Sequence, residues 1–183
     1  VGNHGENYSN KIDASLISFN SDVIPVNKIQ SLFSGPFEFV SPETGMNVYK
    51  SGRTTGVTPQ GGLNSENKSV VLSTSWSGNV YYCPSDYIHN DGTRNEVSSV
   101  QHIAQFEDCV LYLCNGEWFS DSGDSGSGIF TDSTEGNPKL LGLHFAGATS
   151  SNPLRSYGVA CKINNIISEL SVSAWSGERS IKD

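Results

Sequence analysis

Short apolar or alternating runs, separated by Gly, Asn, Asp and Pro, recur along most of the chain. Valine, tyrosine and phenylalanine are frequent within the runs and favour β-strands, whereas the residues between the runs favour turns. The pattern predicts an all-β barrel or sandwich. The predicted strands are residues 13–19, 46–51, 68–76, 79–83, 107–114, 127–130, 139–145 and 156–163.

One segment differs, because its apolar residues repeat at helical spacing. They predict a C-terminal helix over residues 161–170, with a face formed by Ile163, Ile166, Ile167 and Leu170. Residues 85–100 are polar and rich in turn formers, which predicts a long surface loop. The polar residues after Leu170 are expected to fray.

The composition is that of a folded chain of moderate size. Its 183 residues are 36% hydrophobic and 16% charged, which suits one domain or two small barrels that share a core. The net charge of -8 argues against nucleic acid or an anionic membrane as a partner, because both select basic patches. The longest apolar run, Cys109 to Cys114, is too short to cross a bilayer.

The cysteines predict no metal site. They show no CxxC spacing, and no histidine clusters with them. Two disulfides in three possible connectivities and buried free thiols are equally compatible with the sequence. The four residues are Cys83, Cys109, Cys114 and Cys161.

The stretch WFSDSGDSGSGIF, Trp118 to Phe130, carries the main chemical signal. A serine hydroxyl is a poor nucleophile, so serine catalysis needs a base and a site for the developing oxyanion. Gly123 and Gly126 flank Asp124 and Ser125, and glycine tolerates backbone angles that turn N–H groups into one concavity. On composition alone a plain Gly/Ser turn is the better explanation, but the stretch lies between two predicted strands and not at a domain boundary.

GDSGSGIF resembles the nucleophile loop of chymotrypsin-like serine proteases, and four other segments resemble that family in the same order. KIDASLISF is similar to the segment with the catalytic aspartate. GMNVYKSGRTTGVTPQG is similar to the first hairpin of the second barrel in the streptogrisin-like or glutamyl-endopeptidase-like branch. LLGLHFAG resembles the substrate-lining strand, and SYGVACKINNIISEL resembles the last strand and C-terminal helix. Together these segments span most of the chain.

This resemblance implies a trypsin-like double β-barrel with a complete six-stranded second barrel, a partial first barrel and a C-terminal helix. Residues 1–40 would hold the end of the first barrel and the interdomain link, residues 41–170 the second barrel, and residues 171–183 a polar tail. It also implies a secreted or extracellular serine endopeptidase that acts on polypeptides and uses no cofactor.

Carried over by position, Ser125 is the expected nucleophile, which attacks the peptide bond and forms an acyl-enzyme. The backbone N–H groups of Gly123 and Ser125 are the expected oxyanion hole. Asp13 is the expected carboxylate that orients the catalytic histidine. Without the resemblance, Asp13 would be read as an ordinary carboxylate at a strand edge.

The histidine departs from the family's order of His, Asp and Ser. His4 lies only nine residues before Asp13, while His89 and His102 fall on the second-barrel side. Three explanations are open: a protease cut after its histidine, an isolated fragment, or a noncatalytic homologue that binds proteins. We expect the first, with the base on a segment or chain upstream of Val1, because half a barrel exposes strand edges and apolar surface.

The resemblance places the walls of the specificity pocket at residues 119–122 and 145–147 and near Gly158. The position that holds an aspartate in trypsin-type enzymes is a phenylalanine, so a preference for Lys or Arg is not expected. A histidine stands where glutamate-specific relatives and viral 3C-type proteases place one, which favours cleavage after Glu or Gln; the alternative is a strand histidine that faces away from substrate. The expected pocket residues are His144, Ser120, Ser122, Phe119, Phe145 and Gly147.

Asp124 needs a cationic partner, because burial of an unpaired carboxylate is costly. In the bacterial branch that partner is a basic side chain on the hairpin, and Lys50 occupies roughly this position. We expect Lys50 to approach Asp124, with Arg53 as the second candidate.

Overall fold

The computed structural model describes residues 9–15, 28–29, 33–34, 37–82, 102–132, 138–151 and 154–172. These residues form mainly β-strands. The elements are β1 (Ser9–Asn10), β2 (Lys28–Ile29), β3 (Phe33–Ser34), β4 (Glu38–Phe39), β5 (Asn47–Gly52), β6 (Gly56–Thr58), the 3₁₀ helix η1 (Gly62–Asn64), β7 (Ser69–Tyr82), β8 (His102–Asn115), β9 (Gly128–Asp132), β10 (Pro138–Ser151), β11 (Leu154–Lys162) and α1 (Ile163–Glu169).

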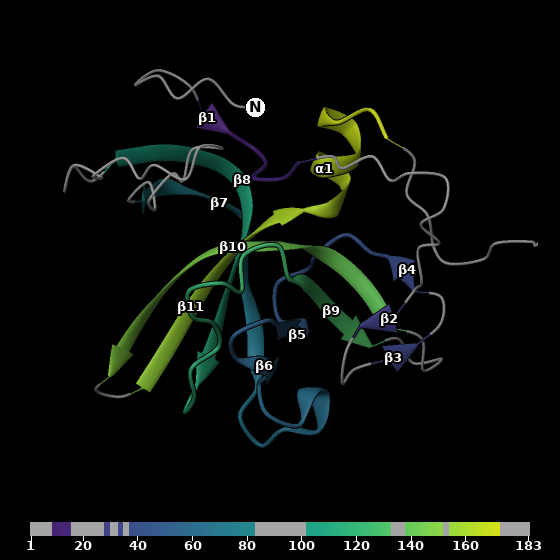
Figure 1. Cartoon of the computed structure of the whole chain (residues 1–183), viewed down its shortest axis with the longest axis vertical. Coiled ribbons are helices and arrows are strands. Elements are labelled where there is room, and N and C mark those ends of the chain that lie inside the picture. Colours follow the sequence, from purple (N-terminus) through teal and green to yellow (C-terminus); the bar gives the residue numbers. More distant parts are fainter. Residues whose placement is uncertain are drawn as a thin grey trace, which may run out of the picture.

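Six strands close into a barrel in the order β5, β7, β8, β11, β10 and β9 (Figure 1). The ring closes because β5 pairs with β7 at one end and with β9 farther along. Closure leaves no unpaired edge in the ring. The short strands β1, β4 and β6 attach to β8, β10 and β5 from outside the ring.

The barrel interior is filled by alternate residues of its strands. In β8, Val110, Tyr112 and Cys114 are at most 1% exposed, whereas Leu111 and Leu113 between them are half-buried. This alternation matches the period of two expected for a strand with one face in the core. The inner cluster consists of Val48, Val71, Val110, Tyr112, Cys114, Phe119, Ile129, Leu141 and Ala160.

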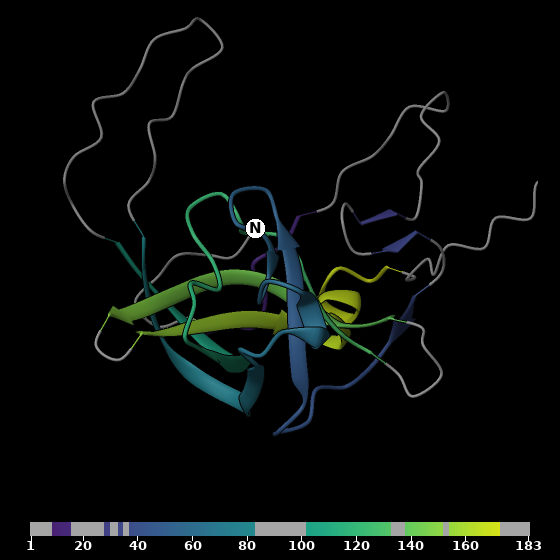
Figure 2. The same cartoon turned by 90° about the horizontal axis from the view of Figure 1, so that it is seen from below.

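A second cluster lies beneath the C-terminal helix. Ile163 and Ile166 of α1 are buried, and Ile163 joins a cluster with Tyr49, Phe130 and Leu140. Ile167 packs against the same cluster, so three members of the predicted helical stripe lie where the stripe places them. Seen from below, β10 and β11 lie side by side (Figure 2).

The helix boundary predicted at residue 161 is wrong by two residues. Cys161 and Lys162 end β11 and pair with Leu143 and Gly142 of β10. The backbone of this pair is packed closely, because a Cβ added to Gly142 would overlap the Cys161 carbonyl oxygen. The ladder hydrogen bonds with β10 therefore prevail over the local helical pattern until Ile163.

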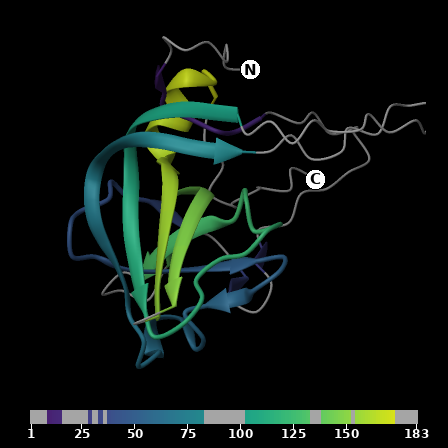
Figure 3. The ribbon, with the colours of Figure 1, turned by 90° about the vertical axis from the view of Figure 1, so that its left-hand side faces the viewer.

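Three of the strand predictions also need correction. The runs 68–76 and 79–83 join into one strand, β7, which follows β8 as a long curved pair (Figure 3). Register shifts near Ser73, Trp76 and Gly78 let the strand continue through the polar residues between the two runs. Gly78 leaves room for the Trp76 ring. In the run 13–19, the described residues 13–15 lie outside any strand, and pairing occurs earlier, in β1.

Several sequence predictions lie outside the described residues. These are the loop 85–100, the end of the tail after residue 172, and Cys83. Within the described part of the chain, no helix is long and apolar enough to span a membrane. The same residues contain no group of three or more His, Cys, Asp or Glu side chains that could hold a metal ion.

Candidate active site

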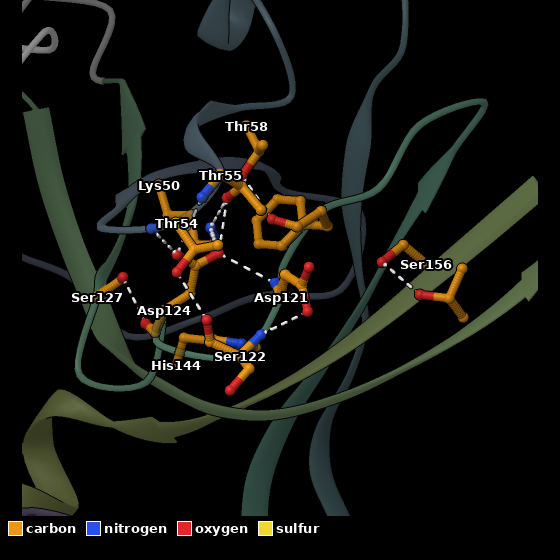
Figure 4. Close-up of polar contacts among 12 residues, drawn as sticks. Lys50, Thr54, Thr55, Thr58, Asp121, Ser122, Asp124, Ser127, His144 and Ser156 are labelled. Atoms are coloured by element: carbon orange, nitrogen blue, oxygen red, sulfur yellow. Dashed lines mark hydrogen bonds and ion pairs between the residues drawn. The ribbon is translucent and has the colours of Figure 1, made fainter.

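Asp124 lies fully buried and is surrounded by hydrogen-bond donors, most of them from the β5–β6 hairpin (Figure 4). Lys50 Nζ lies 2.9 Å and Thr55 Oγ1 2.7 Å from Asp124 Oδ2. The backbone N–H of Thr54 donates to Oδ1 at 2.8 Å, and that of Asp121 donates to Oδ2 at 3.1 Å. The predicted pairing of Lys50 with Asp124 is confirmed.

The pair remains charged although both side chains are fully buried. Burial alone would raise the pKa of Asp124, but hydrogen bonds from Thr55, Lys50 and two backbone amides hold that pKa well below its ordinary value. Burial lowers the pKa of Lys50, and the hydrogen bond and charge of Asp124 oppose this effect. Gly52 makes room for the pair, since a Cβ there would overlap the Asp124 carboxyl group.

The loop that contains Ser125 is fixed from both sides. Gly123 and Gly126 adopt φ angles of 97° and 89°, which glycine reaches without steric cost. The Ser127 hydroxyl donates to the Asp124 carbonyl at 2.5 Å. Gly126 N–H donates to the His144 carbonyl at 2.8 Å, and His144 N–H donates to the Ser127 carbonyl at 2.9 Å. Strand β10 therefore clamps the loop through its backbone.

Ser125 itself is exposed, and its hydroxyl donates to the Phe145 carbonyl at 3.4 Å. Among the described residues, the N–H groups of Gly123 and Ser125 donate to no acceptor. Arg53 does not pair with Asp124; its guanidinium lies beside Gly123, 2.5 Å from where a Cβ would stand. The loop thus exposes one hydroxyl and two backbone N–H groups without an acceptor in the described part of the chain.

His144 is held beneath this loop by Tyr112, whose hydroxyl is hydrogen-bonded to His144 Nδ1. The imidazole is 3% exposed. Burial, and then the charge of Lys50, lower the pKa of His144 to about 4, so the ring is neutral at pH 7. Tyr112 fits because Gly158 has no side chain; a Cβ there would overlap the phenol ring.

Three of the predicted pocket residues converge. A Cβ placed on Gly147 would lie 3.0 Å from Ser120 Oγ and 3.8 Å from His144 Cε1, so both side chains border the space beside Gly147. Phe119 is fully buried behind them, with its ring centroid 4.7 Å from that of Tyr112. The Ser120 hydroxyl and the His144 imidazole therefore lie next to each other, with the apolar ring of Phe119 behind them.

Ser122 and Phe145 lie differently from the converging residues. The carbonyl of Ser122 accepts a hydrogen bond from Thr54 Oγ1 at 2.6 Å, and its side chain is exposed. Phe145, like Gly147, contributes to a groove of about 1010 Å³. Its ring packs on Phe106 at a centroid distance of 4.5 Å.

Asp13 lines the same groove as Phe145 and is exposed. Its backbone N–H donates to Cys161 Sγ at 2.9 Å, which fastens the residues after β1 to the end of β11. The Phe145 carbonyl accepts the hydrogen bond from Ser125. Asp13 therefore shares the groove with Phe145, the residue to which Ser125 is hydrogen-bonded.

His144, the histidine whose side chain the structure describes, does not line this groove. His144 is tied to Tyr112, and His102 begins β8 opposite Tyr82. His4 and His89 lie outside the described residues.

Sequence reasoning missed the residues that support the site. Thr54 and Thr55 follow Lys50 in the hairpin and donate to Asp124. Their role could have been inferred from their spacing from Lys50, because a hairpin turn directs backbone amides to one side. Tyr112 and Gly158 carry none, because a tyrosine in an apolar strand and a glycine in a neighbouring strand look like ordinary core positions.

The comparisons with known proteins identify the fold. No family model and no curated protein matches the chain. A glutamic-acid-specific serine protease, described as using a histidine triad in substrate binding, matches with a TM-score of 0.53 and 16% identity over 86% of this chain and 64% of its own. Chymotrypsin of Cellulomonas bogoriensis matches with a TM-score of 0.51 and 13% identity over 86% and 66%.

At these identities the likeness establishes the fold, and the predicted trypsin-like β-barrel with its C-terminal helix is confirmed. The chain spans less than two thirds of the length of either protease.

We predict that Lys50→Met lowers the free energy of unfolding by about 3–5 kcal/mol, because it leaves a buried carboxylate without its cation. Urea denaturation at pH 7 measures this loss. Lys139→Met is the matched control: Lys139 pairs with Glu38 at 3.3 Å on the surface, and its loss costs less than about 1 kcal/mol. Equal losses for the two variants would contradict the role given to the Lys50–Asp124 pair.

We also predict that His144 makes the protein less stable as the pH falls. Its pKa is about 4 in the folded chain and 6.5 ordinarily, so the unfolded chain binds the additional proton between these values. The contribution amounts to roughly 3 kcal/mol of stability lost between pH 7 and pH 4. His144→Gln removes it, and the measurement is the difference in unfolding free energy between the two pH values. Identical pH dependence in both proteins would show that His144 titrates normally.

Proposed function

We propose that this chain is the second-barrel part of a serine endopeptidase that cuts peptide bonds through an acyl-enzyme on Ser125. The observation that carries the proposal is the state of the nucleophile loop. Asp124 points into the barrel and is held by Lys50, while Ser125 is exposed and the Gly123 and Ser125 amides have no acceptor among the described residues.

In the proposed reaction, Ser125 Oγ attacks the scissile carbonyl carbon as a base removes its proton. The new oxyanion accepts hydrogen bonds from the N–H groups of Gly123 and Ser125, each worth about 3–4 kcal/mol in comparable sites. The protonated base then gives its proton to the leaving amine, and water later hydrolyses the ester by the same route in reverse.

The proposed base is a histidine on a segment or chain that precedes Val1, seated in the groove beside Phe145. Two observations support this seat. Asp13 borders the groove and would accept a hydrogen bond from the imidazole, and the Ser125 hydroxyl contacts the carbonyl of Phe145, which lines the same groove. An imidazole between them would complete the order carboxylate, base and nucleophile.

The proposed preference is for Glu or Gln before the cut. The space beside Gly147 is bordered by Ser120 Oγ and by the His144 ring, and a neutral imidazole can donate one N–H to a carboxylate or amide oxygen. The Tyr112 hydroxyl is hydrogen-bonded to Nδ1, and the Val159 backbone is a further partner of the ring. The proposed donation to substrate would come from Nε2. The buried Phe119 offers no negative charge to a Lys or Arg side chain.

The alternative function is that of a noncatalytic homologue that binds proteins. It is favoured by one observation, that the described histidine side chain nearest the loop, His144, is buried against Tyr112 and not free to act as a base.

A fluorophosphonate probe separates the two functions. We predict that the probe labels Ser125 when the chain is produced together with its upstream segment, because only an activated serine reacts. Peptide mapping by mass spectrometry locates the label. Ser125→Ala abolishes it, and Ser77→Ala, which alters an exposed serine of β7, leaves it unchanged. Absence of labelling both with and without the upstream segment establishes the noncatalytic alternative.

The pocket assignment has its own test, which uses the unmodified chain produced together with its upstream segment. We predict that His144→Ala lowers kcat/KM by roughly ten- to hundredfold for peptides with Glu or Gln before the cut, because their polar groups lose a buried donor. Peptides with Leu at that position lose less than about threefold. Equal losses for all peptides would place His144 in the scaffold and not in the pocket.

A further inference from the structure

Cys109 and Cys161 lie on neighbouring antiparallel strands, one residue beyond the last pair of the ladder. The register of β8 and β11 runs from Asn115 opposite Arg155 to Val110 opposite Ala160, and Cys109 and Cys161 are the next residues along the two strands. Opposed residues in such a ladder have Cα atoms about 4.5–5.5 Å apart. A disulfide requires about 4.4–6.8 Å, so a continuation of the ladder by one step suits one.

The two thiols also interact. The interaction with Cys161, together with burial, raises the pKa of Cys109, and the Cys109 thiol donates to the Glu107 carbonyl at 3.4 Å. Both side chains are completely buried. Cys161 Sγ has a second partner, the backbone N–H of Asp13 at 2.9 Å. The sulfur atoms therefore lie together under the residues that follow β1.

Cys114 is excluded from this pair by the pleat of β8. It lies five residues after Cys109 on the same strand, so the alternation of side chains directs it to the other face. It belongs to the cluster inside the barrel and stands opposite Ser69 and Ser156, whereas Cys109 belongs to the cluster formed with Ala104, Phe106 and Val159.

We propose that Cys109 and Cys161 are a redox pair that forms a disulfide between β8 and β11 when the protein meets a small-molecule disulfide such as oxidised glutathione. Local opening of the strand ends exposes one cysteine, whose thiolate attacks the glutathione disulfide and releases one glutathione thiolate. The second cysteine then displaces the other glutathione from the mixed disulfide. The two cysteine protons pass to the two released glutathiones, and the two electrons lost by the protein reduce the oxidant.

Oxidation has a consequence for Asp13. An S–S bond of about 2.05 Å draws Cys161 Sγ towards Cys109 and away from the Asp13 amide, which loses its acceptor. Residues 11–14 are then held mainly by the pairing of β1 with β8 at Gln105 and Phe106. An effect on catalysis rests on the proposed function, because only there does Asp13 orient the base. The disulfide itself does not depend on that function.

The test is disulfide mapping of the whole chain after incubation of the folded protein with excess oxidised glutathione. Remaining thiols are alkylated in denaturant, and a protease that cuts after Leu111 or Tyr112 separates Cys109 from Cys114. We expect the Cys109–Cys161 peptide to exceed every other linked pair by at least about tenfold, with Cys114 alkylated. Oxidation of the urea-unfolded chain is the control and gives mixed pairs, because no register directs it.

Single variants and amide exchange complete the test. Cys114→Ala retains the linked peptide, whereas Cys109→Ala leaves Cys161 alkylated and without an internal partner. The Asp13 amide loses protection from hydrogen exchange in the oxidised protein relative to the reduced one. The proposal is overturned if Cys109 and Cys161 are both recovered alkylated, or if either is joined to Cys83, Cys114 or glutathione. Failure to label Ser125 would instead overturn the proposed function and leave this result untouched.

Discussion

The buried ion pair of Lys50 and Asp124 is the interaction on which the candidate site depends. A carboxylate taken out of water is tolerated only where charge and hydrogen bonds surround it, and the β5–β6 hairpin supplies both through Lys50, Thr54 and Thr55. Because Asp124 is thereby fixed inside the barrel, the next residue, Ser125, is directed outward. The loop acquires this shape from groups within the described barrel and needs no inserted chain terminus to hold it.

The same cation also influences the pocket. Lys50 Nζ lies 5.3 Å from the centre of the Phe119 ring, and its charge is the second cause, after burial, of the low pKa of His144. The imidazole is therefore kept neutral by the group that organises the nucleophile loop. The backbone hydrogen bonds between His144 and the loop reinforce this connection. Loop and pocket consequently form one packed unit, in which a change to Lys50 alters both.

Sequence alone predicts this site where a single physical requirement has few solutions. A buried carboxylate demands a cation, and the resemblance of the hairpin to the bacterial branch placed that cation at Lys50; alternating apolar runs predicted the strands around Val48, Ile129 and Leu141. Prediction failed where tertiary packing decides between local patterns. Strand β7 continues through a polar interruption at Gly78, and pairing with β10 keeps Cys161 and Lys162 in a strand although the helical pattern begins at Cys161. The role of Tyr112 depends on Gly158 in another strand, and no local pattern records such a pair.

The two sides of the candidate site differ in how firmly they are held. The nucleophile loop is fixed by a buried ion pair and by the backbone of β10. Asp13 belongs to a short segment outside the ring, attached by the two-residue strand β1 and by one hydrogen bond to a sulfur atom. Few buried contacts permit local opening at low cost. In the proposed triad, the carboxylate would affect rate by orienting the base. The weakly held side is therefore the one at which assembly or oxidation would change the proposed activity while the Ser125 loop stays intact.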